Sequence, residues 1–550
     1  MVKNKLENDL IKTLKKLDLK IKNNYVVEIP NNIDHGDFST NIALVNSKIN
    51  KMKPLDLANI ITQEFSKKKE YKTVEVAGPG FINFRFANNF YHKKLIEIVQ
   101  KGRRYGSSKY GAQKKVLIEF VSANPTGPLN IVNARAAAYG DTLSRIMNFL
   151  GFEAFSEYYI NDAGNQVDIL AESIEIRYRE LHGEIFEEFP PEAYHGDYII
   201  DLAIKLNSID AAKLLHYSEV DRLERMKNFA LEEIHQMQVE SLEKYDVHFD
   251  NWMSEKELRK QGSIEEVLSY LTEAHCTYEK DEAIWFSSTE YGDVKDRVLM
   301  KADGNTTYFV PDIAYHLTKF QRGFDIIIDV LGPDHHGYVP RLKAAIQALK
   351  YDQDKLEIVY LQHINLFDQG EHVKMSKRAG KIVTMDDLIE EVGKDAARYF
   401  FIDRKPSAHL NFDMELAKKK TNENPVFYCQ YAHARINSIL KKALKENISI
   451  KEFNVKNLRR LNKPDELNLI KKMIDFSSVL TSVADSREPH RLASFVHELA
   501  GMFHRYYSKY TIVNKDHFEL SQSRLYLITA IKNIITISLN LMGISAPRKM

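Results

Sequence analysis

One segment near residue 120 constrains the fold of this chain more than any other. Residues 116–120 (VLIEF) have the pattern of a buried strand, and a turn rich in Pro and Gly, SANPTGPLN, follows at 122–130. Helical periodicity then runs from Ala134 to about Leu150, and the pattern of a second strand follows at 152–162. This order of strand, turn, helix and strand is how a parallel nucleotide-binding sheet begins. The sequence therefore predicts an α/β core.

The rest of the chain predicts further domains around this core. We expect a multidomain α/β protein with a Rossmann-type parallel-sheet core. The expected domains are an N-terminal α+β domain at 1–110, the core at 111–370 with a helical insertion at about 167–280, a connecting segment at 371–420 and an all-helical domain at 421–550. Within the core, strand patterns return at 283–288, 298–304, 306–316, 324–332 and 356–364.

Composition excludes several classes of protein. The chain has 44% hydrophobic and 28% charged residues, which is too apolar for a disordered protein. No run approaches the ~18 apolar residues of a membrane-spanning helix, and the first 20 residues lack the apolar centre of a secretory signal. Two cysteines, Cys276 and Cys429, exclude a disulfide framework and a zinc site built on cysteines. We expect a cytosolic enzyme without membrane contact.

The net charge of +1 conceals an uneven distribution. Residues 1–110 hold 21 Lys and Arg against 11 Asp and Glu, and residues 421–550 hold 20 against 11. The segment between them holds 36 against 54. Two basic ends therefore flank an acidic centre. A basic face can simply be solvated, but two separate ones favour a long polyanion that touches both.

Motifs along the whole chain resemble those of arginyl-tRNA synthetases. They are HGDFSTNIAL (35–44), VAGPGFINFRF (76–86), IEFVSANPTGPLN (118–130), YYINDAGNQ (158–166), YHGDYI (194–199), GPDHHGYVPRLKAAIQAL (332–349), KMSKRAGKIVTMDDL (374–388), NPVFYCQYAHARI (424–436) and LNLMGISAP (539–547). The resemblance implies a class I synthetase that activates arginine with ATP and transfers it to the 3′ end of tRNA-Arg. It also implies that the N-terminal domain meets the tRNA corner and that the C-terminal helices bind the anticodon.

The KMSK segment, 374–377, corresponds to the second signature of class I synthetases. Adenylate formation develops negative charge on pyrophosphate, and ammonium groups on a loop can stabilise this charge in the transition state. The resemblance assigns catalytic roles to Lys374, Ser376 and Lys377, and an ATP contact to Met375. A solvated basic loop is the alternative for a bare KxxK pattern.

The first signature departs from the family pattern of His, apolar residue, Gly, His. Here it is Asn130-Ile131-Val132-Asn133. Asparagine keeps an NH₂ donor for phosphate but has no cationic form, and Val132 adds bulk where glycine would let adenine approach, so we expect overpacking. The resemblance assigns catalytic roles to Asn130 and Asn133. It assigns ATP contacts to Pro125, Thr126, Gly127, Asn130, Val132, Asn133, His335 and His336.

The arginine site matches the family pattern better. A guanidinium needs a buried carboxylate, because it presents a planar fork of donors. The resemblance implies an arginine site made of Glu119, Ser122, Asn124, Tyr308, Asp312 and Asp334. We expect no dedicated metal site, because adjacent histidines in a strand point to different faces and Mg²⁺ should arrive with the ATP phosphates. ATP with Mg²⁺ is thus a substrate, and no tightly bound cofactor is expected.

For tRNA, the resemblance implies contacts at Asn83, Phe84, Gln430, Tyr431, Arg435 and Tyr506. Aromatic side chains can stack on splayed bases, although helix packing explains any one of them equally well. Two readings of function remain open. One is an active, monomeric arginine–tRNA ligase, and the other is a catalytically impaired paralogue that binds tRNA-Arg or arginine, with a regulatory or inhibitor-resistance role.

Overall fold

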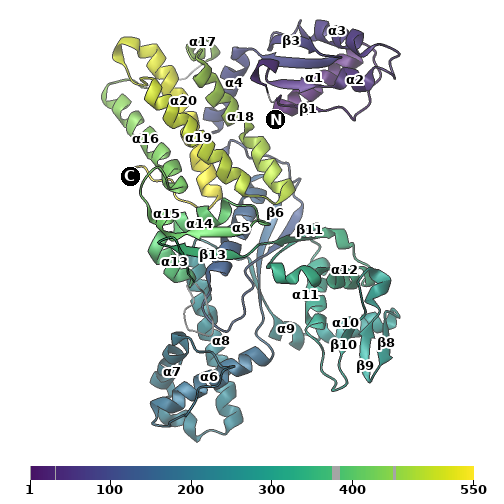
Figure 1. The fold of residues 1–550 in the computed structure, drawn as a ribbon, viewed down its shortest axis with the longest axis vertical. Helices are drawn as coiled ribbons and strands as arrows, with labels where there is room; N and C mark the ends of the chain where they lie inside the picture. The colour runs from purple at the N-terminus through teal and green to yellow at the C-terminus, as the bar shows by residue number, and fades with distance from the viewer. Residues whose placement is uncertain (1, 31, 374–383, 450–453) are drawn as a thin grey trace.

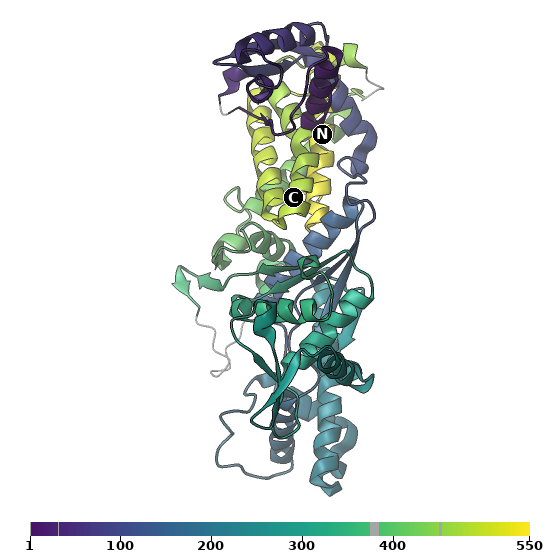
Figure 2. The ribbon, with the colours of Figure 1, turned by 90° about the vertical axis from the view of Figure 1, so that its right-hand side faces the viewer.

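We analysed a computed structural model of the chain, which describes residues 2–30, 32–373, 384–449 and 454–550. The molecule is elongated (Figures 1 and 2). The N-terminal domain lies at one end, beside the C-terminal helices, and the inserted helices α6 to α8 lie at the other. The parallel sheet of the core lies between these ends (Figure 1).

The core is a five-stranded parallel sheet in the order β12-β11-β5-β6-β7. Its strands are β5 (Lys115–Glu119), β6 (Glu153–Ile160), β7 (Asn251–Ser254), β11 (Ile326–Leu331) and β12 (Leu356–Tyr360). Four residues of β5 are buried, as expected for a strand covered on both faces. The prediction of a Rossmann-type parallel-sheet core is confirmed.

Helix α5 (Ile131–Phe149) follows β5 and lies directly against it. A Cβ atom on Gly140 would come within 2.2 Å of the Phe120 ring, so glycine is required for this close approach. The helix is buried along most of its length. The N-terminus of α5 is therefore held firmly at the carboxyl end of β5.

The helical insertion projects from the core between β6 and β7. It consists of α6 (Asn165–Leu181), α7 (Asp197–Asp210) and α8 (Glu219–Lys244), which share a small apolar core of their own. Strand β7 belongs to the core sheet although it falls within 167–280, the range expected for the insertion. Its four residues are too few to stand out against the surrounding helices.

A second excursion joins β7 to β11. It contains α9 (Glu255–Lys260), α10 (Ser263–Glu273) and a three-stranded antiparallel sheet of β8 (Thr277–Lys280), β9 (Ala283–Phe286) and β10 (Arg297–Met300). The strand expected at 306–316 is wrong, because α11 (Phe309–Gln321) occupies this stretch. Its buried residues Val310, Ile313, Ala314 and Leu317 have helical spacing, and Pro311 is tolerated in the first turn of a helix.

Beyond β11, helix α12 (Val339–Ala348) leads to β12. A small sheet of β13 (Ile364–Asp368), β14 (Glu371–His372) and β15 (Leu410–Asp413) then follows, with α13 (Met385–Val392), α14 (Lys394–Ile402) and α15 (Met414–Lys418).

The N-terminal domain is α+β, as predicted. Its antiparallel sheet has the order β1-β2-β4-β3, made of β1 (Val27–Glu28), β2 (Phe38–Thr40), β3 (Tyr71–Ala77) and β4 (Phe81–Phe86). Helices α1 (Val2–Lys16), α2 (Ile42–Asn46) and α3 (Pro54–Phe65) belong to this domain. Helix α4 (Asn88–Lys101) then packs against three of the C-terminal helices, α17 (Val455–Leu458), α18 (Pro464–Ser486) and α20 (Phe518–Leu541).

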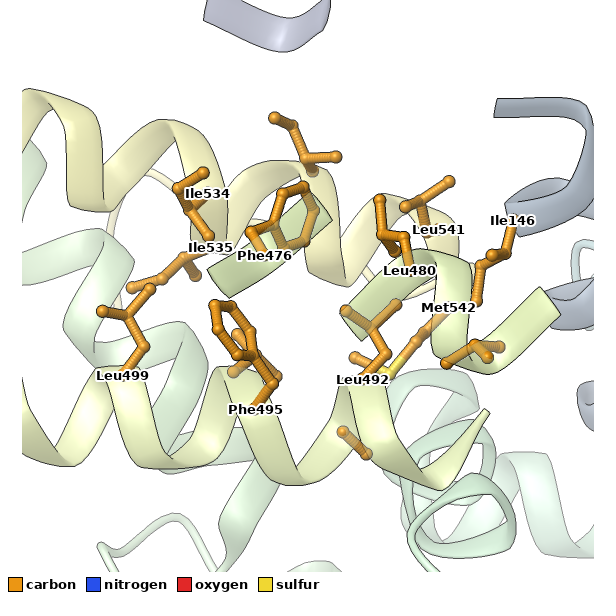
Figure 3. Close-up of a cluster of buried hydrophobic side chains, with 14 of the residues drawn as sticks. Ile146, Phe476, Leu480, Leu492, Phe495, Leu499, Ile534, Ile535, Leu541 and Met542 are labelled. Atoms are coloured by element: carbon orange, nitrogen blue, oxygen red, sulfur yellow. The ribbon is translucent and has the colours of Figure 1, made fainter. Parts of the chain in front are cut away.

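The C-terminal region is helical, as predicted. Its helices are α16 (Pro425–Lys445), α17 (Val455–Leu458), α18 (Pro464–Ser486), α19 (His490–Lys509) and α20 (Phe518–Leu541). Figure 3 shows Phe476 of α18, Phe495 of α19 and Ile535 of α20 meeting in one buried cluster, which Ile146 of α5 joins at its end. The C-terminal domain and the core thus share one continuous apolar interior. No helix in the described ranges has the length and apolar character to cross a membrane.

Candidate active site

Polar residues gather at the carboxyl edge of the parallel sheet. The chain leaves β5 toward β6 and β7 on one side, whereas β11 and β12 lie on the other side. The sheet therefore has its topological switch point between β5 and β11, where ligands bind in folds of this kind. Glu119 ends β5, the turn 122–130 follows it, and a 3-10 helix, Pro333–Gly337, follows β11.

The turn after β5 starts with two residues in left-handed backbone conformations. Val121 has φ +70° and Ser122 has φ +37°, which is strained for a side chain with a Cβ and especially for β-branched valine. Strain of about 1–3 kcal/mol at such a residue persists where the surroundings enforce it, commonly at a ligand site. The Ser122 hydroxyl donates to Glu119 at 2.8 Å and accepts from the Tyr159 amide at 3.1 Å. Ser122 thereby joins the ends of β5 and β6.

The inserted helices hold the same turn from outside. The Gln238 side chain of α8 donates to the carbonyls of Asn124 and Gly127 at 3.3 and 2.9 Å. From the start of α7, the Tyr198 hydroxyl donates to the Thr126 carbonyl at 2.7 Å. The Tyr198 ring lies so close to Gly127 that an added Cβ would be 3.1 Å from it. The turn is fixed by two elements that are distant in sequence.

The first signature forms a capping box at the N-terminus of α5. The Asn130 side-chain oxygen accepts from the amides of Val132 and Asn133 at 2.8 and 3.2 Å. In return, the Asn133 side-chain oxygen accepts from the Asn130 amide at 3.0 Å. In each side chain, the oxygen accepts hydrogen bonds from the helix end, and the NH₂ group stays available as a donor.

Val132 does not overpack the protein interior. Its side chain is 49% exposed, so it displaces no core residue. The expected overpacking concerns the surface that an adenine ring would approach, and it stays a prediction. Any effect of Val132 falls on a ligand that approaches this surface.

The chain that follows the second signature lies beside the first signature. Residues 374–383, which include Lys374, Met375, Ser376 and Lys377, lie outside the described residues. The chain that follows them is fixed beside the first signature, because the Met385 amide donates to the Leu129 carbonyl at 2.8 Å and Thr384 forms a bridge with Asn130. Thr384 then caps α13.

Helix α11 begins directly after the exposed residue Tyr308, and the predicted acid Asp312 lies in its first turn. The Asp312 carboxylate accepts a short hydrogen bond from the Tyr338 hydroxyl. Burial, and then the charge of Asp312, raise the pKa of Tyr338 well above its usual value, so this hydroxyl stays a donor. Among the described residues, no cation pairs with Asp312. The site therefore holds a carboxylate without a counter-charge.

The second predicted acid, Glu119, has a counter-charge within the protein. Its carboxylate accepts from the buried Lys319 ammonium at 2.5 Å. Burial alone would lower the pKa of Lys319, but the attraction of Asp329 and Glu119 outweighs burial and raises it. Lys319 is thus charged, and Glu119 is neutralised before a substrate enters.

The remaining predicted contacts differ in their exposure to solvent. Asn124 is exposed and its side chain donates to Gln166 at 2.8 Å, whereas Pro125 is buried. Asp334, His335 and His336 are exposed on the 3-10 helix after β11. The His336 ring stacks on Tyr360 at the end of β12, with the ring centres 3.7 Å apart.

Comparison with known families places the whole chain. Residues 4–86 match the model of the arginyl tRNA synthetase N-terminal domain, and residues 94–440 match the catalytic domain of class I (R) tRNA synthetases. Residues 429–550 match the DALR anticodon binding domain. The chain belongs to the arginyl-tRNA synthetase family.

Relatives support this membership along nearly the full length. A protein named arginine–tRNA ligase 1 from Halalkalibacterium halodurans is 44% identical, over 96% of this chain and 94% of the relative. An arginine–tRNA ligase from Listeria monocytogenes is 45% identical over the same shares. The solved arginyl-tRNA synthetase of Thermus thermophilus matches all of both chains with a TM-score of 0.74, and at 19% identity it supports the fold alone.

For a member of this family, the predicted tRNA contacts fall into two groups. Asn83 is half-buried on β4, and Tyr431 and Arg435 are half-buried on α16. The Arg435 guanidinium lies over the rings of Tyr431 and of exposed Tyr507, 4.4 and 5.0 Å from their centres. These three side chains offer a base an aromatic and cationic surface.

The other group is enclosed by the protein. Phe84 is buried in the N-terminal domain and Tyr506 among the C-terminal helices, so neither ring has a free face for a base. The Gln430 amide donates to Asp395 at 2.8 Å and to the Ser545 carbonyl at 3.0 Å. Phe84, Gln430 and Tyr506 are therefore not available for a contact with tRNA in this conformation.

Several residues of the arginyl-tRNA synthetase site carry no local signal in the sequence. Gln238 and Tyr198 support the turn after β5 from the insertion, and Lys319 and His316 of α11 bond to Glu119 of β5 and Asp329 of β11. A lysine with apolar neighbours at helical spacing was the one available hint, because a lysine on the buried face of a helix needs an acidic partner.

Proposed function

We propose that this protein is an arginine–tRNA ligase that activates arginine with ATP and transfers it to the 3′ end of tRNA-Arg. One observation carries this proposal. At the carboxyl edge of the sheet, Asp312 bonds to the Tyr338 hydroxyl and has no cationic partner among the described residues. A guanidinium supplies the single positive charge and the fork of donors that such an acid accepts. We expect the protein to act in the cytosol as a monomer.

The proposed mechanism relies on positioning and charge stabilisation. Asp312 and Tyr338 hold the guanidinium, while Glu119, Ser122 and Asn124 lie at the end of β5, where the arginine backbone would be bound. The free NH₂ groups of Asn130 and Asn133 donate to ATP phosphates at the N-terminus of α5, a position that favours anions. The Lys374 and Lys377 side chains would stabilise the charge that develops on pyrophosphate. Mg²⁺ enters with the ATP.

The described part of the site supports an active enzyme over the impaired paralogue. The altered signature keeps a capped helix N-terminus and two amide donors. An active ligase is therefore the better hypothesis.

The decisive assay is arginine-dependent exchange of pyrophosphate into ATP, with tRNA-Arg present. We expect exchange well above the background without arginine. Asp312→Asn should raise the KM for arginine about 100-fold, the usual cost of removing one partner of a desolvated charge pair, and leave the Kd for tRNA unchanged. Asp354→Asn, at an exposed acid of the same domain, is the matched control. Absence of exchange with intact tRNA binding would overturn the ligase proposal.

A further inference from the structure

Three carboxylates lie side by side across the centre of the core sheet. Glu157 of β6 is in register with Glu119 of β5, which is in register with Asp329 of β11. Residues in register on neighbouring strands project from the same face of a sheet, and like charges in such positions repel one another. All three are buried, with exposed fractions of 0%, 8% and 2%. An uncompensated row of this kind would not remain ionised.

Every counter-charge of this row comes from helix α11 or from the residue that follows it. The Lys319 ammonium donates to Glu119 at 2.5 Å and to Asp329 at 2.7 Å. Arg322 donates to both oxygens of Glu157, at 2.5 and 2.9 Å, and the Tyr315 hydroxyl also donates to Glu157 at 2.8 Å. The row is therefore the surface on which α11 docks.

His316 connects this row to Asp312. One ring nitrogen lies 2.7 Å from the Asp312 backbone carbonyl and the other lies 2.8 Å from the Asp329 carboxylate. His316 thereby links the first turn of α11, which carries Asp312, to the carboxylate row.

The same residues have the spacing of a metal site, but an ammonium group lies among them. Ligand atoms of Glu119, His316 and Asp329 all lie within 4.8 Å of one another. The Lys319 nitrogen is 2.5, 3.4 and 2.7 Å from these three residues, in that order. The cation that this cluster needs is therefore the lysine of α11.

We propose that Lys319 is a positioning residue for arginine recognition. By pairing with both Glu119 and Asp329, it fixes Glu119 at the end of β5 and sets α11 so that Asp312 is the acid left for the guanidinium. This inference rests on the proposed ligase function, because it assigns a task within the same arginine site. Lys319 acts through Glu119 and Asp312, and needs no contact with the substrate.

Charge balance, rather than bulk, is the property to test. Lys319→Met leaves two adjacent buried carboxylates without an ammonium group, so Glu119 should leave its position. We expect the KM for arginine to rise on the order of 100-fold, the scale of an unpaired buried charge, with kcat and the KM for ATP within about threefold. The double variant Lys319→Met, Asp329→Asn removes one charge of each sign, and should recover at least about tenfold of the loss in KM.

The matched control is Arg524→Met, which breaks a comparably buried ion pair with Glu466 in the C-terminal helices, 3.0 Å long. It should lower the thermal midpoint and leave the KM for arginine unchanged. If Lys319→Met does not fold, the double variant is compared with the wild type directly, and a KM within about tenfold is expected from the restored balance.

Two outcomes would overturn the inference. One is a double variant whose KM for arginine is no lower than that of Lys319→Met, because a lysine with a purely structural role would gain nothing from Asp329→Asn. The other is a loss in Lys319→Met that falls on kcat with an unchanged KM for arginine. Failure of the proposed function would look different, since the wild type itself would then show no arginine-dependent exchange.

Discussion

At the scale of single residues, the altered first signature shows how one side chain can serve two purposes. Asn130 uses its oxygen to cap α5 and retains its NH₂ group for a ligand. A histidine at this position could donate to phosphate as well, but histidine is not a preferred N-cap residue. The exchange of histidine for asparagine therefore gives up a cationic form and gains a firmly capped helix.

These two roles of Asn130 can be separated by substitution. Asn130→Asp keeps the capping oxygen and suits the helix dipole, but it removes the amide donor and adds negative charge. We expect its thermal midpoint to match the wild type, while the KM for ATP rises at least about tenfold. Asn130→Ala lacks both groups and should in addition lose about 1 kcal/mol of stability. Equal values of the KM for ATP in Asn130→Asp and wild type would contradict the proposed phosphate contact.

At the scale of elements, the sequence predicts what depends on local pattern. The strand at 116–120, the helix after it and the strand at 152–162 are all present, because their periodicity is set by burial on the sheet. The strand expected at 306–316 is absent. Thr306, Thr307 and Tyr308 have the residue types of a strand, and the helical spacing begins only at Phe309. Register across β6, β5 and β11 is a long-range property, so the carboxylate row could not be predicted.

The same limit applies to the support of the turn after β5. The sequence predicts its residues as a ligand site. The helices that hold the turn, α7 and α8, start only at Asp197 and Glu219. Gln238 is buried and its amide has three partners, the carbonyls of Asn124 and Gly127 and the hydroxyl of Tyr158. The inserted helices thus help to fix the turn after β5, and no pattern in their own sequence predicts this role.

Replacing Gln238 tests this task of helix α8. Gln238→Leu removes one partner of the Asn124 and Gly127 carbonyls and of the Tyr158 hydroxyl, which should cost about 2 kcal/mol of stability. Because the turn would lose its fixed position, we expect kcat/KM for both arginine and ATP to fall at least about tenfold. Gln236→Leu, on the same helix but bonded only to Glu240, is the control and should change neither. Full activity in Gln238→Leu would show that the turn holds its shape alone.

At the scale of the whole molecule, the N-terminal domain and the C-terminal helices form one body. Lys471 of α18 pairs with Asp37 of the N-terminal domain at 2.6 Å, and His92 of α4 bonds to the Leu461 carbonyl at 3.0 Å. The two basic ends predicted from the sequence are therefore adjacent at one end of the elongated molecule (Figure 1). This arrangement suits a tRNA that touches both domains at once, as their family assignments imply.

One acid near this junction opposes its stability at neutral pH. Burial raises the pKa of Asp475 on α18 from 3.8 to about 6, against the opposing charge of Lys472 and with a contribution from Glu498. The folded state therefore binds a proton more tightly than the unfolded state does. Stability should be highest below about pH 4 for this group, and should fall as the pH rises toward 6 and stay lower above it.

Asp475→Asn should remove this penalty. At pH 7.5 we expect the variant to be more stable than the wild type by about 3 kcal/mol, since each pKa unit corresponds to about 1.4 kcal/mol. The gain should shrink as the pH is lowered below 6, because the wild-type carboxyl then takes up its proton. The measurement is the thermal midpoint of both proteins between pH 4.5 and 7.5.

The control is Asp465→Asn on the same helix. It should lower the stability at pH 7.5, because hydrogen bonds from Lys509 and Tyr510 lower the pKa of Asp465. A lower midpoint for Asp475→Asn at pH 7.5 would mean that its carboxylate has a favourable partner in the folded state.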